Sequence, residues 1–141
     1  MSSMHSSSQT PATQPMPDGP VSNRAAWYGA DIENSDDWIV QLTPDGPGEL
    51  DAALRDSVDR RDEILGIDAD SFPLPALSSK LHAMRDEVMS GRGIALLRGL
   101  PVDRYSMEEI GRVLFGIGRH MGTLRSQNAK GHLLGHVCDI G

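Results

Sequence analysis

Apolar residues recur at helical spacing in three stretches of the chain, and segments rich in proline and glycine separate them. The first stretch predicts a helix from Glu49 to about Ile64. Its apolar face consists of Leu50, Ala53, Leu54 and Val58. The second predicts a helix that ends before Gly91, because glycine often adopts the left-handed conformation that follows a helix. Its apolar face consists of Leu77, Leu81, Met84 and Val88.

The third helix has the clearest start of the three. Ser106 and Glu109 form a capping box, in which each side chain can satisfy a backbone amide of the other residue. The apolar face that follows consists of Ile110, Val113, Leu114, Ile117 and Met121. Gly116 and Gly118 weaken this helix by about 1 kcal/mol each relative to alanine. Their presence therefore indicates close packing against a neighbouring element.

The composition of other stretches is typical of strands. Residues 38–42 are β-branched and aromatic, which predicts a short strand. Residues 93–98 are continuously apolar up to Arg98, which predicts a strand buried on both faces. Residues 123–140 predict two more strands, joined by a turn at 128–131. Residues 43–48 and 71–75 break regular structure. The resulting fold class is α+β, and its last strands look like the beginning of a larger sheet.

Residues 1–24 form a separate segment by composition. They contain six serines, two threonines and four of the nine prolines. A stretch with so few large apolar side chains cannot offset the entropy lost on ordering, so we expect a disordered tail. It lacks the apolar region of a secretory signal, and no later run approaches the length of a membrane helix. We therefore expect a soluble, cytoplasmic protein whose folded domain covers residues 25–141.

The charges are unevenly distributed along the chain. Residues 1–91 carry six Lys and Arg against sixteen Asp and Glu, whereas residues 92–141 carry seven against four. The acidic part argues against general affinity for nucleic acid, and we expect neither a nucleic-acid nor a membrane partner. The single cysteine excludes an internal disulfide and any zinc site that needs several cysteines.

Potential metal ligands are concentrated near the end of the sequence. They are His132, His136, Cys138 and Asp139, with His120 twelve residues before His132. On one strand the two later histidines would be about 13 Å apart, too far for one metal ion. The two-histidine, one-carboxylate triad of non-heme iron enzymes needs a carboxylate two residues after a histidine, and no histidine here has one. The sequence therefore predicts no metal site within these residues.

Several segments together resemble a known family. GRGIALLRGLPV (91–102), FPLP (72–75) and GIGRHMG (116–122) are similar to the N-terminal portion of the TauD/TfdA family of Fe(II)- and 2-oxoglutarate-dependent dioxygenases. SQNAKGHLLGHVCD (126–139) resembles one branch of that family. The likeness covers roughly residues 25–141 and lies in the ordered set of segments, because no single one is diagnostic.

The resemblance implies N-terminal helices and the first strands of a double-stranded β-helix, the clavaminate synthase-like jelly roll, incomplete at the C-terminus. Family members hydroxylate a small-molecule substrate. They hold iron through a His-x-Asp/Glu motif and a distal histidine, and 2-oxoglutarate through a later arginine. None of these can be placed on this sequence. We therefore expect an N-terminal portion that has no catalytic residue or metal ligand of its own and binds neither cofactor alone.

Two residues remain as candidate substrate-binding positions. A turn at Gln127 and Asn128 would present their amide groups toward a substrate pocket, although both residue types also stabilise turns through their own side chains. Arg98 follows the predicted buried strand. Two roles are open for it: pairing with a carboxylate at the rim of the pocket, or a purely structural ion pair.

Two other functions are compatible with the sequence. The chain would serve as a non-catalytic interaction module if the helical face of Leu77, Leu81, Met84 and Val88 docked on a full-length relative, and a homo-oligomer is also open. A small zinc enzyme that uses His120, His136 and Cys138 has the right number of ligands. Its geometry has no support from the spacing, and it ranks last.

Overall fold

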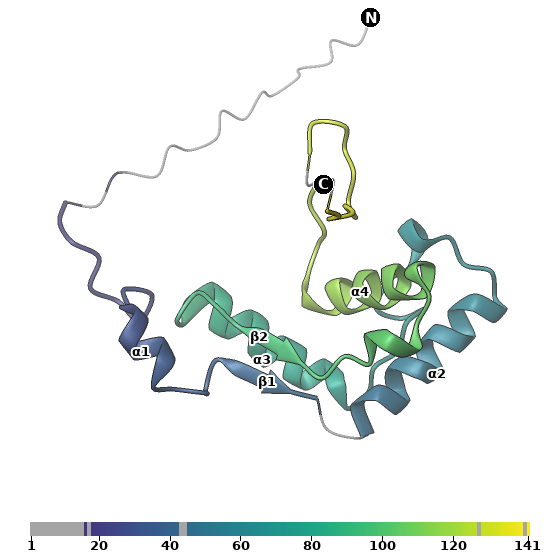
Figure 1. Cartoon of the computed structure of the whole chain (residues 1–141), viewed down its shortest axis with the longest axis horizontal. Coiled ribbons are helices and arrows are strands. Elements are labelled where there is room, and N and C mark those ends of the chain that lie inside the picture. Colours follow the sequence, from purple (N-terminus) through teal and green to yellow (C-terminus); the bar gives the residue numbers. More distant parts are fainter. Residues whose placement is uncertain (1–15, 17, 43–44, 127, 140) are drawn as a thin grey trace, which may run out of the picture.

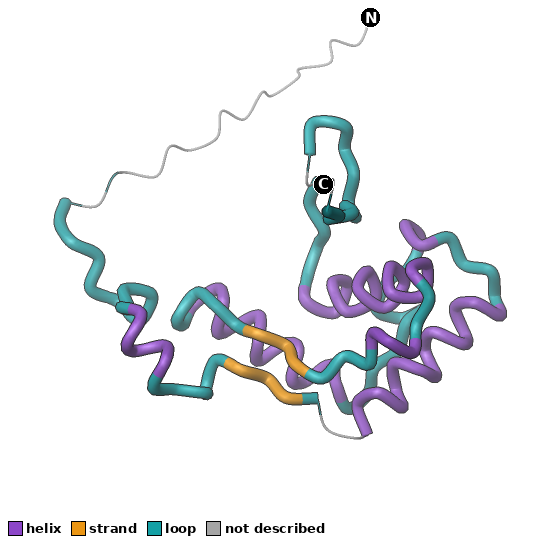
Figure 2. The backbone as a smooth tube through the Cα atoms, viewed as in Figure 1, coloured by secondary structure: helices purple, strands orange, loops and turns teal. Residues whose placement is uncertain are grey.

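The computed structural model describes residues 16, 18–42, 45–126, 128–139 and 141 (Figure 1). Helices dominate the described part of the chain, and the two strands are short (Figure 2). In chain order the elements are α1 (Gly29–Glu33), β1 (Ile39–Gln41), α2 (Asp45–Asp59), the 3-10 turn η1 (Ile64–Gly66), α3 (Leu77–Ser90), β2 (Leu96–Arg98), the 3-10 turn η2 (Val102–Arg104) and α4 (Met107–Met121). The arrangement agrees with the α+β class.

The two strands pair in parallel, with Ile39 opposite Leu96. Parallel neighbours need a long crossover, which α2 and α3 provide here. The prediction that residues 93–98 form a strand buried on both faces is wrong. Only three residues are extended, and Leu97 packs against the core. Leu96, which points to the opposite face because strand side chains alternate, is 37% exposed.

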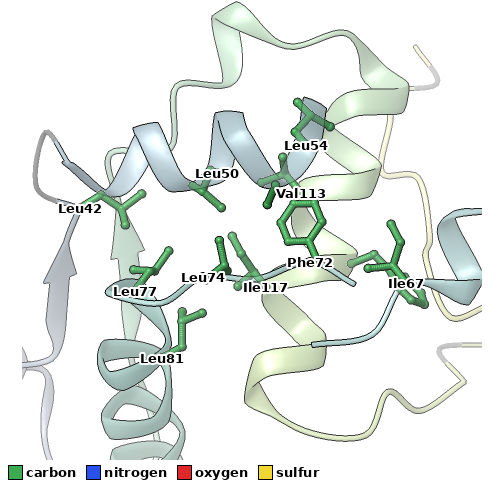
Figure 3. Packing of buried hydrophobic residues seen from close by; sticks show 12 residues of the cluster. Leu42, Leu50, Leu54, Ile67, Phe72, Leu74, Leu77, Leu81, Val113 and Ile117 are labelled. Atoms are coloured by element: carbon green, nitrogen blue, oxygen red, sulfur yellow. The ribbon is translucent and has the colours of Figure 1, made fainter. Parts of the chain in front are cut away.

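The hydrophobic core lies between α2, α3, α4 and the segment before α3 (Figure 3). Phe72 occupies its centre and is completely buried. The buried apolar residues are Leu42, Leu50, Ala53, Leu54, Ile67, Phe72, Leu74, Leu77, Leu81, Val113, Phe115 and Ile117. The three predicted apolar faces supply seven of these twelve residues, and most of the others come from the segments between the helices.

Some predicted core positions face solvent instead. Val58 is 43% exposed, and Ser57 beside it is buried because its hydroxyl accepts a hydrogen bond from Arg112 at 3.2 Å. Leu114 is 46% exposed, while Phe115 takes its place in the core. Each error moves the buried face by one residue, which is within the width of the stripe that a helix can bury.

The expectation that glycines of α4 allow close packing is confirmed. A Cβ atom on Gly116 would lie 2.4 Å from Cδ1 of the Phe72 ring. A Cβ atom on Gly118 would lie 2.9 Å from Leu124, which follows the helix. Gly116 thus allows an aromatic ring to rest directly on the helix backbone, and this contact offsets the low helix propensity of glycine.

The first predicted helix is shifted toward the N-terminus. It was expected from Glu49 to about Ile64, but α2 begins at Asp45 and ends at Asp59, and Ile64 belongs to η1. Pro47 does not prevent the earlier start, because the first four amides of a helix have no partner within it. Predicted breaks at 43–48 are therefore wrong from residue 45 onward, and residues 43–44 lie outside the described residues.

Two charged side chains of the helical region have structural roles. The Glu49 carboxylate accepts hydrogen bonds from the backbone amides of Ala76 and Leu77, at 2.7 and 2.9 Å, and so caps the start of α3. Arg112 is buried and donates to the carbonyl oxygen of Asp62 at 2.6 Å and to the Glu108 carboxylate at 3.0 Å. The contacts of Glu49 satisfy amides at the start of a helix, which have no partner within it, and Arg112 satisfies the carbonyl oxygen of Asp62.

The segment around α1 is attached to the end of α3 by polar contacts. Arg92 forms a two-point ion pair with Asp37, with nitrogen–oxygen distances of 2.5 and 2.8 Å. The hydrogen bonds from Arg92, and a further one from Ser35, lower the pKa of the Asp37 carboxyl. The indole nitrogen of Trp27 donates to the carbonyl oxygen of Arg92 at 3.0 Å. Residues 1–15 and 17 of the predicted tail lie outside the described residues.

Candidate functional site

The candidate site is the loop that follows α4. Gly122 ends the helix, and the chain then leaves the helical body and returns (Figure 1). Leu124 and Leu133 pack against the hydrophobic core, and a methyl group of Leu134 lies 3.3 Å from the position of a Cβ atom on Gly111. Apolar contacts thus hold both ends of the loop, and its polar tip projects away.

Asn128 organises the tip of this loop. Its side-chain oxygen accepts hydrogen bonds from the backbone amides of Lys130 and His132, at 3.0 and 3.2 Å. Its carbonyl oxygen accepts from the Ser126 hydroxyl at 2.8 Å and from the Gly131 amide at 3.0 Å. Gly131 has a φ of 82°, a conformation that glycine adopts without strain. The predicted turn at 128–131 is therefore confirmed.

The side-chain amide of Asn128 also contacts His132. The Nδ2 group of Asn128 donates to Nδ1 of His132 at 3.0 Å, which places the proton of the neutral imidazole on Nε2. Nε2–H is then the ring's remaining hydrogen-bond donor, and His132 is exposed. The second candidate for substrate binding, Gln127, lies outside the described residues. The substrate-binding role of both residues stays a prediction.

The strands predicted for 123–140 are not formed in the described parts of that range, 123–126 and 128–139. A strand forms only when its backbone hydrogen-bonds to a neighbouring strand. The two described strands, β1 and β2, pair with each other and not with this segment. The loop is held by turn hydrogen bonds and by its leucines. The apolar residues Leu124, Leu133 and Leu134 therefore serve as the contacts of a loop that packs on the helical body.

The potential metal ligands do not converge. His136, Cys138 and Asp139 are exposed in the loop, whereas Nε2 of His120 donates to the carbonyl oxygen of Phe72 at 2.6 Å inside the helical region. Within the described residues, no three His, Cys, Asp or Glu side chains are placed to hold a metal ion. The described residues therefore do not fit an iron centre. Arg98 is exposed and forms no ion pair among the described residues.

A polar cluster that the sequence did not predict lies between α2 and η2. The hydroxyl of Tyr105 donates to Oδ1 of Asp51 at 2.6 Å, and Arg104 forms an ion pair with Oδ2 of Asp51 at 2.6 Å. Burial raises the pKa of the Tyr105 hydroxyl, and the hydrogen bond to Asp51 raises it further. These residues lie more than fifty positions apart, so no local pattern could have indicated them. They border a cavity of about 280 Å³.

Comparisons with known proteins identify two relatives. The chain is 25% identical over 122 residues to FR-33289 synthase of Streptomyces rubellomurinus, covering 86% of this chain and 36% of that protein. It is 30% identical over 122 residues to a taurine hydroxylase-like protein of Stachybotrys chartarum, covering 86% of this chain and 32% of that protein. The chain thus spans about a third of the length of the curated relatives it matches. No family model matches the sequence.

None of the helices in the described residues is long and apolar enough to cross a membrane.

Both relatives match most of the chain, beyond the short segments on which the resemblance was first based. They confirm the resemblance to the TauD-like family of Fe(II)- and 2-oxoglutarate-dependent oxygenases.

Proposed function

We propose that this chain supplies the N-terminal part of an oxygenase that uses Fe(II) and 2-oxoglutarate to hydroxylate a small molecule. The observation that carries this proposal is the relationship to FR-33289 synthase and to the taurine hydroxylase-like protein over 86% of the chain. The name of the relative from Stachybotrys chartarum refers to the hydroxylation of taurine, a small molecule. The α+β arrangement is compatible with this function, because the helices provide a packed support from which a loop can reach a substrate pocket.

The chain's own contribution is the shape of the loop after α4. Leucines fix both ends of the loop on the helical body, and Asn128 fixes its tip. Since most hydrogen-bonding groups of Asn128 are used within the loop, we propose that it positions His132 toward the substrate. Substrate binding by Gln127 and Asn128 themselves remains a proposal from the sequence. The exposed Nε2–H of His132 is then a donor for an oxygen or an anionic group of the ligand.

Iron and 2-oxoglutarate belong to the complete oxygenase in this proposal. When bound, they would supply the oxidising chemistry. No three described His, Cys, Asp or Glu side chains are placed to hold iron, and we propose that the ligands of the iron and the arginine that holds 2-oxoglutarate belong to other parts of the complete oxygenase. We also propose that the two strands and the loop lie at the border of a jelly roll, which those other parts would complete.

The face proposed for an interaction module is only half available. Leu77 and Leu81 are 3% and 0% exposed, since both belong to the hydrophobic core, whereas Val88 is 38% exposed. We propose the oxygenase as the function because the relationship to the two relatives supports it, and no observation on the described residues favours the module.

The test uses the complete reading frame that contains these 141 residues. We expect the purified product to convert 2-oxoglutarate to succinate in the presence of Fe(II) and O₂, at a rate that a correct small-molecule substrate increases. Asn128→Ala should raise KM more than it lowers kcat, because it disturbs a binding loop. Lys130→Ala is the matched control, because only the backbone of Lys130 contacts Asn128.

Two results would contradict the proposal. A complete product without Fe(II)-dependent turnover of 2-oxoglutarate would remove the oxygenase assignment. Stoichiometric Fe(II) binding by the 141-residue chain alone would show that an iron site exists within it. The proposal that the iron ligands lie outside this chain would then be wrong.

A further inference from the structure

A second cavity lies beside the end of α4. It has a volume of about 510 Å³ and is bordered by the segment before α3, by α3 and by the end of α4. Its polar lining residues are Asp70, Ser78, His82, Arg119 and His120. Pro73, Leu74 and Pro75 provide an apolar wall. None of these side chains takes part in the proposed function above.

Arg119 is the unusual residue of this cavity. Its Nε atom is buried and has no hydrogen-bond partner. A buried donor that lacks a partner has lost its hydration without compensation, which is rare in proteins. Arg119 forms no ion pair among the described residues. The guanidinium group is therefore available for a ligand oxygen.

Asp68, whose carboxyl group senses the charge of Arg119, does not pair with it. Asp68 has a lowered pKa, chiefly because the backbone amide and the hydroxyl of Ser71 act on its carboxyl group, and Arg119 contributes only a weaker charge effect. The Oδ1 atom of Asp68 accepts a hydrogen bond from the Ser71 amide at 2.7 Å. The carboxylate thus serves its own turn and leaves the guanidinium without a direct partner.

His82 is the second donor that the cavity offers to a ligand. It lies four residues after Ser78 on α3, so both side chains project from one face of that helix. The Ser78 hydroxyl donates to the carbonyl oxygen of Pro75 at 3.4 Å, and the Nε2–H of His120 donates to that of Phe72 at 2.6 Å. The cavity therefore combines Arg119 and His82 with an apolar wall.

We propose that this cavity binds a small ligand that carries one carboxylate group and a short apolar body. The flat edge of a guanidinium group, with its Nε and Nη hydrogens, matches the two oxygens of a carboxylate. The apolar wall of Pro73, Leu74 and Pro75 accommodates the body of the ligand. Asp70 repels an additional negative charge, so the cavity prefers a single carboxylate to a phosphate dianion.

The experiment is a titration of the 141-residue chain with butyrate, followed by the ¹H–¹⁵N resonances of the Arg119 Nε–H group and of the backbone amide of Ser78, which is present in every variant. We expect both resonances to shift in a saturable way, and inorganic phosphate to produce smaller shifts at the same concentration. Arg119→Lys should weaken butyrate binding by about 10-fold or more, because it removes a charge-assisted, two-point contact. Arg85→Lys is the control, since Arg85 is exposed and pairs with Asp86.

His82→Ala provides a second, independent variant, because His82 is exposed and its loss leaves the core intact. We expect a several-fold weaker interaction with an unchanged melting temperature. An Arg119 resonance that does not move with butyrate, or an equal response in Arg119→Lys and in the wild type, would overturn the proposal. None of these measurements requires iron or 2-oxoglutarate, so they are independent of the oxygenase assignment.

Discussion

The helical body and the loop after α4 are stabilised in different ways. The helical body buries a cluster of twelve apolar residues, Phe72 among them, within the described part of the chain. The loop has leucines at its base, but its tip depends on the hydrogen bonds of one side chain, Asn128. Apolar burial is cooperative and distributed over many residues, whereas a turn held by one amide can change without unfolding the rest. The body therefore sets the stability of the chain, and the loop can be altered for function.

The largest expected effect comes from a substitution in the core. In Gly116→Ala the new Cβ atom would meet the Phe72 ring at 2.4 Å. Overpacking costs about 1–3 kcal/mol, and improved helix propensity returns at most about 1 kcal/mol. We expect a net loss of about 1–2 kcal/mol in the free energy of unfolding, measured by urea denaturation.

Gly48→Ala is the matched control for that measurement. Gly48 also lies within a helix, α2, but no atom comes within 4 Å of the position of its Cβ. This substitution should leave stability unchanged or raise it by up to about 1 kcal/mol. Equal effects of both substitutions would show that Phe72 does not rest on α4.

A smaller effect is expected where a charge joins two helices. Glu49→Ala removes the acceptor for the amides of Ala76 and Leu77 at the start of α3. Loss of a helix cap costs about 0.5–2 kcal/mol, and we expect about 1 kcal/mol in a urea melt followed by circular dichroism. Glu63→Ala, an exposed residue outside the regular helices, is the control. If both variants have the same midpoint, Glu49 does not cap α3.

The loop should respond locally to substitution. Asn128→Ala removes the side chain that binds the backbone amides of Lys130 and His132. We expect faster proteolytic cleavage between residues 126 and 134, with a global unfolding free energy within about 0.5 kcal/mol of the wild type. A global loss as large as that of Gly116→Ala would remove the distinction between the body and the loop.

The smallest effect concerns the ion pair of Asp37 with Arg92. Hydrogen bonds from Arg92 lower the pKa of the Asp37 carboxyl, so the pair contributes stability above the pKa of the unfolded carboxyl and loses it as the pH falls through the lower, folded value. Asp37→Asn should slightly lower the melting temperature at pH 7. The difference from the wild type should begin to shrink below about pH 4.

Asp36→Asn is the control for the ion pair, because Asp36 is an exposed neighbour without a side-chain ion pair in the described residues. Its melting temperature should follow that of the wild type at every pH. A constant difference between Asp37→Asn and the wild type across the pH range would mean that the charge of Asp37 is not responsible.

The local features of the fold were predictable from the sequence. The capping box of Ser106 and Glu109, with its side chain to amide distance of 3.2 Å, occurs as predicted, and α3 ends before Gly91. The left-handed conformation expected of Gly91 is wrong, because its φ is −107°. Each depends on residues within one turn of helix. The start of α2 and the absence of strands from the described part of 123–140 were not predictable, because they depend on partners distant in the sequence.

The same distinction applies to the candidate sites. The turn at Asn128 follows from residue types within five positions, and it was predicted. The cavity around Arg119 brings together residues from 70 to 120, and its key property is a missing hydrogen bond. Neither spacing nor composition reveals that property, because it arises only when three segments pack against one another.

The placement of the aromatic residues Trp27 and Trp38 has a spectroscopic consequence. They are the only two tryptophans of the chain, and their indole nitrogens donate to the carbonyl oxygens of Arg92 and Ser35 at 3.0 and 2.6 Å. Neither belongs to the hydrophobic core. Tryptophan fluorescence will therefore report the release of residues 27–38 from the end of α3, whereas the ellipticity at 222 nm reports the helices. Two separate transitions would show that this segment detaches before the body unfolds.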